Sequence, residues 1–123
     1  ASDTIQSGKL IPNFAVENSF SRTVSSHGFT AFVRTKKITD MQHQRLTTLL
    51  KVVPLNDALI VEHPALSSAM LDNGVNAIIT RPDGYVADLI YDDIVRSTRE
   101  ALARSAVIPK DQTSQTAIST QAA

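Results

Sequence analysis

Hydrophobic and polar positions along the chain alternate between two kinds of segment. Residues 29–34, FTAFVR, are apolar at nearly every position and rich in aromatic and β-branched types. This pattern is typical of a strand that is covered on both faces. Residues 58–61, ALIV, repeat it and predict a second short buried strand. Residues 77–80 and 85–90 predict two further strands, which flank a polar turn at residues 81–84.

The polar turn, Arg81-Pro82-Asp83-Gly84, predicts the reversal of a β-hairpin. Pro82 sets φ at the first corner, Asp83 can bond the backbone ahead of it, and Gly84 accepts a positive φ without steric cost. These residues therefore predict a structural turn, because each polar position has a backbone role.

Apolar positions at helical spacing predict three helices, over residues 40–52, 64–73 and 92–106. Thr39 and Gln42 have the spacing of a capping box before the first helix, and Pro54 is expected to stop that helix. Pro64 suits the first position of the second helix, and Gly74 suits the position just after its end.

The remaining segments complete a single domain. Residues 1–9 form a polar lead-in, residues 10–16 an extended segment, and residues 19–26 a short strand or loop. We expect the domain to span residues 10–108, and residues 109–123, a Gln/Ser/Thr/Ala tail, to be flexible. The order strand, helix, strand, helix, hairpin, helix, with a right-handed βαβ unit at its start, predicts an α/β fold of the thioredoxin-like kind.

Composition removes several classes of function. The 123 residues include no cysteine, which excludes disulfide exchange, thiolate metal sites and iron–sulfur clusters. Lys and Arg total 12, as do Asp and Glu, so bulk charge favours no nucleic-acid partner. The local basic cluster Arg34, Lys36 and Lys37 is expected to be a solvated strand end. No run approaches the roughly 20 apolar residues of a membrane helix, so we expect a cytoplasmic protein without a membrane partner.

Histidines and glycines do not form a recognisable site in the sequence. His27, His43 and His63 lie in separate predicted elements and lack the close spacing of metal ligands. The glycines are isolated, so there is no phosphate-binding loop. We therefore predict no catalytic, cofactor-binding or metal-binding residue in this chain.

Three acids near the end of the hairpin leave an alternative open. Asp88, Asp92 and Asp93 could form a carboxylate pair of the kind used in general acid–base catalysis. The favoured interpretation is that Asp92 and Asp93 cap the last helix and Asp88 projects from the exposed face of its strand. A small cofactor-independent enzyme built on His27 or on these acids is a further alternative.

Three segments together resemble one protein family. Residues 76–87, NAIITRPDGYVA, resemble a signature near the C-terminus of flavin-dependent aromatic hydroxylases of the phenol hydroxylase and hydroxyphenylpropionate hydroxylase type. Residues 7–16, SGKLIPNFAV, and residues 27–33, HGFTAFV, resemble the opening and a strand of the last domain of these enzymes, in the same order. After Val86-Ala87 the family usually has an aromatic residue and an arginine, whereas this chain has Asp88-Leu89.

The resemblance implies a domain similar to thioredoxin in fold that lacks the redox cysteines. It implies a non-catalytic, structural or dimerising C-terminal domain of an FAD- and NAD(P)H-dependent aromatic monooxygenase. FAD and NAD(P)H would then be bound by the preceding domains, and this chain would bind no cofactor. The implied partners are the flavin-binding catalytic domain or subunit, with a homo-oligomer as the other option. A free-standing protein-interaction module with the same cysteine-free fold is the alternative function.

Overall fold

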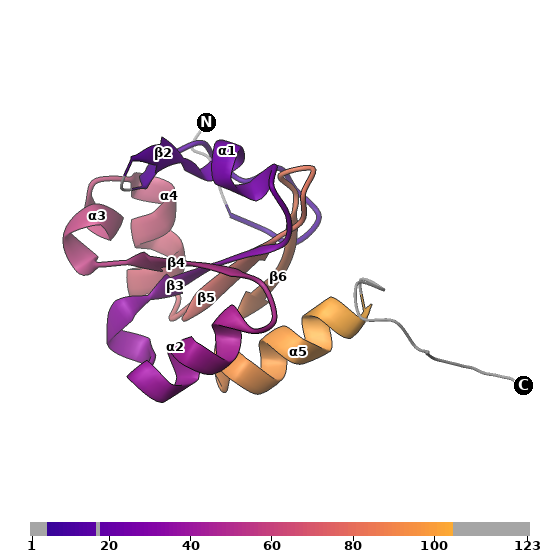
Figure 1. Ribbon diagram of the computed structural model, residues 1–123. Helices are drawn as coiled ribbons and strands as arrows, with labels where there is room; N and C mark the ends of the chain where they lie inside the picture. Colours follow the sequence, from indigo (N-terminus) through magenta and orange to yellow (C-terminus); the bar gives the residue numbers. More distant parts are fainter. Residues whose placement is uncertain (1–4, 17, 105–123) are drawn as a thin grey trace, which may run out of the picture.

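A mixed four-stranded sheet with helices on both faces forms the body of the protein (Figure 1). The computed structural model describes residues 5–16 and 18–104. The strands are β3 (Thr30–Arg34), β4 (Lys51–Leu55), β5 (Ala77–Thr80) and β6 (Val86–Ile90), in the order β4-β3-β5-β6. β3 and β4 run parallel, while β5 is antiparallel to both β3 and β6. The expected βαβ unit is present, with helix α2 (Asp40–Thr47) between β3 and β4.

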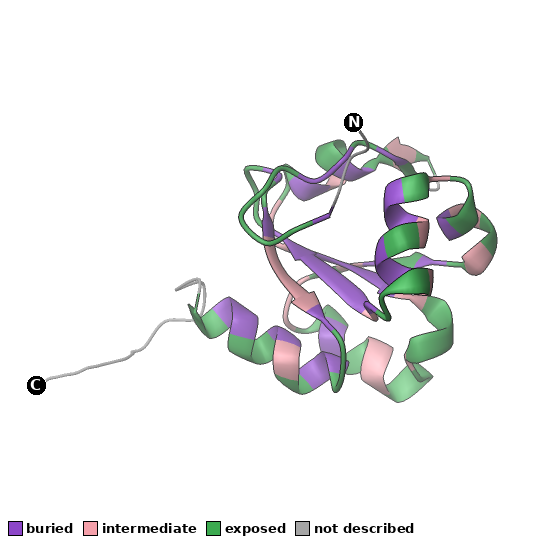
Figure 2. Cartoon of the chain, turned by 180° about the vertical axis from the view of Figure 1, so that it is seen from behind, coloured by how far each residue is buried: buried purple, intermediate pink, exposed green. Residues whose placement is uncertain are grey.

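The sheet separates two apolar clusters (Figures 1 and 2). On one face, α2 and α5 (Ile94–Arg104) cover the strands. On the other face lie α3 (Asp57–Val61), α4 (Pro64–Leu66), the π-helix η2 (Ser67–Asp72) and the N-terminal segment. Strand alternation explains this division, because Phe32 points to the second face while Ala31 and Val33 point to the first.

The β-hairpin lies where the sequence predicts it. β5 has the predicted bounds, and β6 begins one residue later than predicted. The amide of Gly84 donates to the carbonyl of Arg81 at 2.9 Å, and Gly84 has a φ of +86°. The ladder shifts register between Ile79 and Thr80, so β6 contains a bulge.

The predicted strand at residues 58–61 is wrong, because these residues belong to helix α3. Asn56 caps this helix by accepting a hydrogen bond from the amide of Leu59 at 2.8 Å, and Asp57 follows in the first turn. Both residue types favour a helix start, and this signal outweighs the apolar run behind them. The second parallel strand is instead β4, which pairs with β3 along its whole length.

The first long helix is shorter than predicted and ends at Thr47. Its start is as predicted: the Thr39 hydroxyl accepts from the amide of Gln42, and the Gln42 side chain accepts from the amide of Thr39. Beyond it, Leu49 and Leu50 still pack on the α2/α5 cluster from a turn. The apolar pattern in the sequence therefore extends beyond the end of the helix, because the helix and the turn after it pack on the same core.

Pro54 lies inside β4, where the sequence suggested only a helix stop. The amide of Lys51 donates to Phe29 on the β3 side at 3.2 Å. Because amides alternate in direction along a strand, the nitrogen of Pro54 faces the outer side of the sheet, where no ladder donor is needed.

The other outer strand, β6, is partly covered by the N-terminal segment. The amide of Gly8 donates to Val86, and the amide of Val86 donates to Lys9, both at 2.8 Å. Farther along, the amide of Leu89 donates to the side chain of Asp88 at 2.9 Å. Both rims of the sheet thus have groups that hinder pairing with another strand.

The segment at residues 19–26, predicted as a short strand or loop, contains β2 (Ser19–Phe20) and the helix α1 (Ser21–Ser25). β2 pairs with β1 (Ala15–Val16). The buried Ser21 hydroxyl donates to Pro12 at 2.7 Å and accepts from the amide of Phe14 at 3.0 Å. The hydroxyls of Ser25 and Thr80 share a hydrogen bond of 2.9 Å. Small polar residues therefore fix this segment on the sheet.

The ends of the predicted domain have different outcomes. Ile5 is only 5% exposed and belongs to the core, so packing begins within the expected polar lead-in. Residues 105–106 of the predicted last helix and the expected flexible tail at residues 109–123 lie outside the described residues. Within residues 5–16 and 18–104, each helix is too short or too polar to cross a bilayer.

Candidate functional site at the carboxyl end of the parallel strands

The basic cluster predicted from the sequence lies where β3 ends. Arg34 is the last residue of β3, and Lys36 belongs to the 3-10 helix η1 (Thr35–Lys37) that follows. Asp57 begins α3, two residues after β4 ends at Leu55. Arg34 and Leu55 are paired in the ladder, so the two strands end at the same edge and bring these groups together. In α/β sheets, this edge is the usual place for a ligand.

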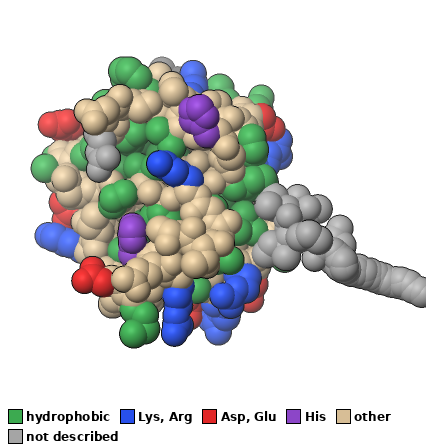
Figure 3. All heavy atoms as spheres, in the orientation of Figure 1, with side chains coloured by type: hydrophobic (Ala, Val, Ile, Leu, Met, Phe, Trp, Pro, Cys, Tyr) green, Lys and Arg blue, Asp and Glu red, His purple; other side chains and the backbone are tan. Residues whose placement is uncertain are grey.

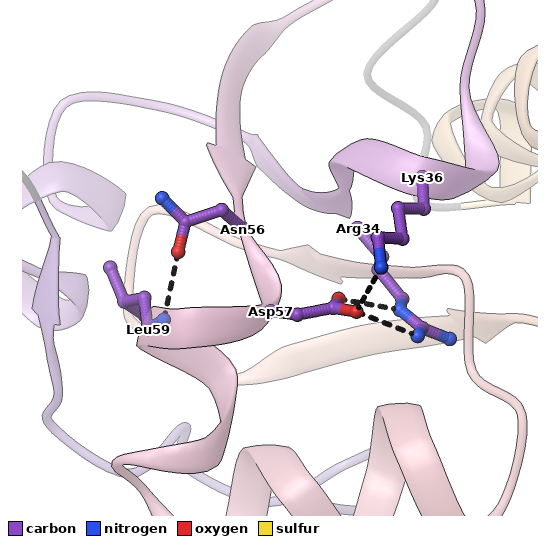
Figure 4. A network of polar contacts seen from close by, with 5 residues as sticks. All are labelled: Arg34, Lys36, Asn56, Asp57 and Leu59. Carbon is purple, nitrogen blue, oxygen red and sulfur yellow. Dashed lines mark hydrogen bonds and ion pairs between the residues drawn. The ribbon is translucent and has the colours of Figure 1, made fainter.

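Asp57 pairs with Arg34 and Lys36, two of the three cations of the predicted cluster (Figure 4). Lys37, the third cation, is exposed. The Arg34 guanidinium binds its carboxylate with two hydrogen bonds, from Nε to Oδ1 at 3.0 Å and from Nη2 to Oδ2 at 3.2 Å. The Lys36 ammonium lies 3.1 Å from Oδ2. The side chain of Arg34 is 17% exposed, whereas that of Lys36 is 70% exposed. The cluster is therefore not simply a solvated strand end, because its arginine is largely covered and paired.

The ion pairs fix the charge of Asp57. Hydrogen bonds from Arg34 and then Lys36 lower the pKa of its carboxyl group to about 2, and the same pairing raises the pKa of Arg34. A general base works best with a pKa near the working pH, so this carboxylate is poorly suited to proton transfer at neutral pH. The geometry instead suits a clamp that joins the end of β3 to the start of α3.

The sequence cluster predicted two members of this network and missed the third. With residues 58–61 interpreted as a strand, Asp57 falls in a connecting segment and has no predicted role. The pair Asn56-Asp57 carried a usable signal, since an Asn cap followed by an acid is typical of a helix start. A helix starting there would have placed Asp57 at the same edge as Arg34.

The three histidines remain on separate elements. His27 lies in the exposed turn between α1 and β3, His43 lies in α2, and His63 precedes α4. The ring of His63 packs on Phe14 with 5.6 Å between centroids, and its Nδ1 atom is buried without a hydrogen-bond partner in the described structure. No group of three or more His, Asp or Glu side chains that could hold a metal ion occurs among the described residues.

The three acids near the end of the hairpin each have a partner of their own. Asp93 accepts a hydrogen bond from the amide of Arg96 at 3.1 Å, and Asp92 accepts one from the hydroxyl of Ser97 at 2.7 Å. This agrees with the predicted place of these two acids at the start of the last helix.

Asp88 differs from its prediction. Its side chain is 28% exposed and forms an ion pair with Arg104 of α5, so it does not project from an exposed face. The reason is that α5 packs over this part of β6, which the strand pattern alone did not reveal.

His27 and the acids of the last helix lie at opposite ends of the sheet. His27 precedes Thr30, which pairs with Thr80 beside the hairpin turn. Asp92 and Asp93 follow Ile90, which pairs with Ala77 at the far end of the same ladder. The arrangement does not bring these groups into one catalytic site.

A second surface feature is an apolar hollow of about 210 Å³ beside β4. It lies between the β1–β2 pair and the outer strand, and Figure 3 shows hydrophobic side chains gathered in a hollow on this face. Its apolar lining comes mainly from Val16, Val24, Val52 and Val53.

Comparison of the chain with protein-family models, with curated proteins and with solved structures gives no match. The functional argument therefore depends on the residues and the geometry described above.

Proposed function

We propose that this chain is a non-catalytic, thioredoxin-like domain that works by docking to the flavin-binding part of an FAD- and NAD(P)H-dependent aromatic monooxygenase. It would serve as the C-terminal domain of that enzyme or as a separate subunit, in a structural or dimerising role. Support for the finer fold comes from the strand order β4-β3-β5-β6, with one parallel pair, an antiparallel hairpin and a closing helix. Residues near the end of β3 provide the second line of support.

A thioredoxin would carry its cysteine near the end of β3 or at the start of the next helix. Here that region contains Arg34, Thr35 and Lys36, and the Asp57 carboxylate forms ion pairs with the arginine and the lysine. A paired arginine and lysine offer no nucleophile for thiol chemistry. This edge therefore suits structural support better than catalysis.

The main observation in favour of the family is that its three resembling segments are neighbours in the fold. Ile11, in residues 7–16, donates from its amide to Gly84 at 2.8 Å, which links that segment to residues 76–87. β3 begins within residues 27–33, and its residues Thr30 to Val33 pair with β5 of the same hairpin. Segments far apart in the sequence thus form one continuous unit, as a shared structural core would.

The chain's own residues do not fit FAD or NAD(P)H. A dinucleotide site needs a glycine-rich turn between a strand and a helix. β3 is followed instead by η1, which contains no glycine and includes Lys36 of the Asp57 network. The proposal therefore assigns both cofactors to the partner.

The apolar hollow beside β4 supports a docking role. Apolar surfaces rimmed by polar groups are common at protein interfaces. Asn18, Ser19 and Lys51 provide the polar rim here. We expect the flavoprotein to cover this hollow.

Size-exclusion chromatography with light scattering tests the proposal. The chain is mixed with a flavoprotein encoded next to it or in the same reading frame, and a stable complex is expected. Asn18→Trp should fill the hollow and weaken the complex by about tenfold or more, which corresponds to about 1.4 kcal/mol. Thr23→Trp, an exposed position on α1 outside the hollow, is the matched control and should leave binding unchanged.

No complex, together with a hydroxylase that is stable and fully active without this chain, would contradict the proposal. A chain that instead forms complexes only with other proteins would support the free-standing interaction module.

A further inference from the structure

A second cavity, distinct from the hollow beside β4, lies between the α4–η2 helix and β6. Its volume is about 320 Å³. Ala65 and Ala69 of the helix, Val75 after it and Leu89 of β6 provide apolar walls. In Figure 2 the buried side of this helix faces the sheet, so the cavity lies beside a well-packed core.

The mouth of this cavity carries uncharged polar groups. Ser68, Asn73 and Tyr91 line it, and Tyr91 is 56% exposed. The backbone amide and the side-chain Nδ2 of Asn73 both donate to the carbonyl of Ser68, at 3.0 and 2.8 Å. Oδ1 of Asn73 and the hydroxyl of Ser68 make no hydrogen bond within the described residues, so both can bind a ligand.

The π-helix creates this mouth. The bond from the amide of Asn73 to the carbonyl of Ser68 spans five residues, where an α-helix would use the carbonyl of Ala69. The carbonyl of Ala69 instead accepts from the amide of Val75 at 3.0 Å. Such π-turns are rare and often occur at functional sites. Here the wider turn places Ser68 and Asn73 together above the apolar walls.

We propose that this cavity binds a small uncharged molecule, about one ring in size, with a single hydroxyl or carbonyl group. The volume is at the lower end of that found for ligand sites. No Lys, Arg, Asp, Glu or His side chain of the described residues lines it, so an ionised ligand would lose water without gaining a charged partner. The apolar walls would hold the ring, while Ser68 or Asn73 would bind its polar group.

Amide chemical shifts of the full chain can test this site, with benzyl alcohol as the probe. A ligand of this size in such a cavity should bind with a Kd of about 1 mM. Shifts are expected at Ser68, Ala69, Asn73, Val75 and Leu89. Benzoate and benzylammonium, which have the same ring and a charge, should bind about tenfold more weakly or not at all.

Ser68→Trp places a large side chain at the mouth and should abolish the shifts. Ser68 is exposed, so this change spares the core. Ala58→Trp, on the exposed side of α3 and outside the cavity, is the matched control and should keep them. Equal binding of the three probes, shifts centred elsewhere, or unchanged binding by Ser68→Trp would overturn the proposal.

This proposal does not rest on the docking function, because the cavity shares no lining residue with the hollow beside β4. If Ser68→Trp weakened the flavoprotein complex while benzyl alcohol caused no shifts, the cavity would belong to a protein interface and the small-molecule proposal would fail.

Discussion

The two ends of the sheet are held by arginine–aspartate pairs of different kinds. At the carboxyl end of β3, Arg34 reaches Asp57, which is 23 residues away and on another element. At the hairpin end, Arg81 pairs with Asp83 within the same turn. The first pair is partly covered, with side chains 17% and 29% exposed, whereas the second is 45% and 47% exposed.

This difference indicates which of the two pairs contributes more to the stability of the fold. A pair within one turn adds little to what Pro82 and Gly84 already fix. A pair that joins the end of a strand to the start of a later helix restricts two elements at once. Exposed ion pairs are also weakened by water, so we expect Arg34–Asp57 to contribute more to stability than Arg81–Asp83.

The largest expected effect is at the hairpin end and concerns its backbone. Gly84→Ala should lower the free energy of unfolding by about 2 kcal/mol, because the position has a φ of +86° and a new Cβ would lie 3.2 Å from Leu10 Cδ1. Urea denaturation measures the change. Gly74→Ala is the control: its φ is +75°, but a Cβ there meets no atom within 4 Å. It should cost about 1 kcal/mol, from strain alone. Equal losses would mean that the contact with Leu10 has no effect.

The comparison of the two pairs is tested directly by matched substitutions. Arg34→Gln should lower the free energy of unfolding by about 1 kcal/mol, because it removes two charged hydrogen bonds from a partly covered site. Arg81→Gln should leave it unchanged within the error of urea denaturation, because that pair is exposed. A greater loss for Arg81→Gln would reverse the ranking of the two ends.

The smallest measurable change is expected in the pH dependence of the carboxyl-end pair. The pKa of Asp57 is about 2 in the folded protein and 3.8 when unperturbed, so its ionised form favours folding above pH 3.8. This contribution should be lost as the pH falls from about 4 to about 2. Urea denaturation of Asp57→Asn should show a shallower loss of stability in this window than the unchanged chain. Parallel curves would contradict a role for this carboxylate.

Much of the sheet could be predicted, because local signals and tertiary packing agree there. The Pro-Asp-Gly turn, the capping box at Thr39 and the apolar run of β3 each have one plausible structure. The parallel pair with β4 was predicted, although at the wrong residues. The resulting α/β class with a mixed sheet agrees with the structure.

The sequence-based predictions are wrong where the same residues are compatible with two kinds of secondary structure. Pro54 can stop a helix or lie on an outer strand, and only the neighbouring β3 decides between them. The apolar run 58–61 could be a buried strand or a short buried helix, and the preceding Asn56 favours the helix.

The sequence predicts two of the three residues in the candidate site and misses the third. Arg34 and Lys36 are visible as a basic cluster in the sequence, but their carboxylate lies 23 and 21 residues away. Only the parallel ladder between β3 and β4 brings it to them.

Pro54 has a consequence for how molecules of this protein behave when crowded. Pro54 has no backbone N–H, so the outer edge of β4 lacks one of the hydrogen-bond donors that a strand of another molecule would need to pair with it. Across the sheet, the N-terminal segment and Asp88 occupy donors of β6. Strand pairing is thereby discouraged at both borders of the sheet. Among the described residues, side chains of helices, turns and hollows are better suited to specific association.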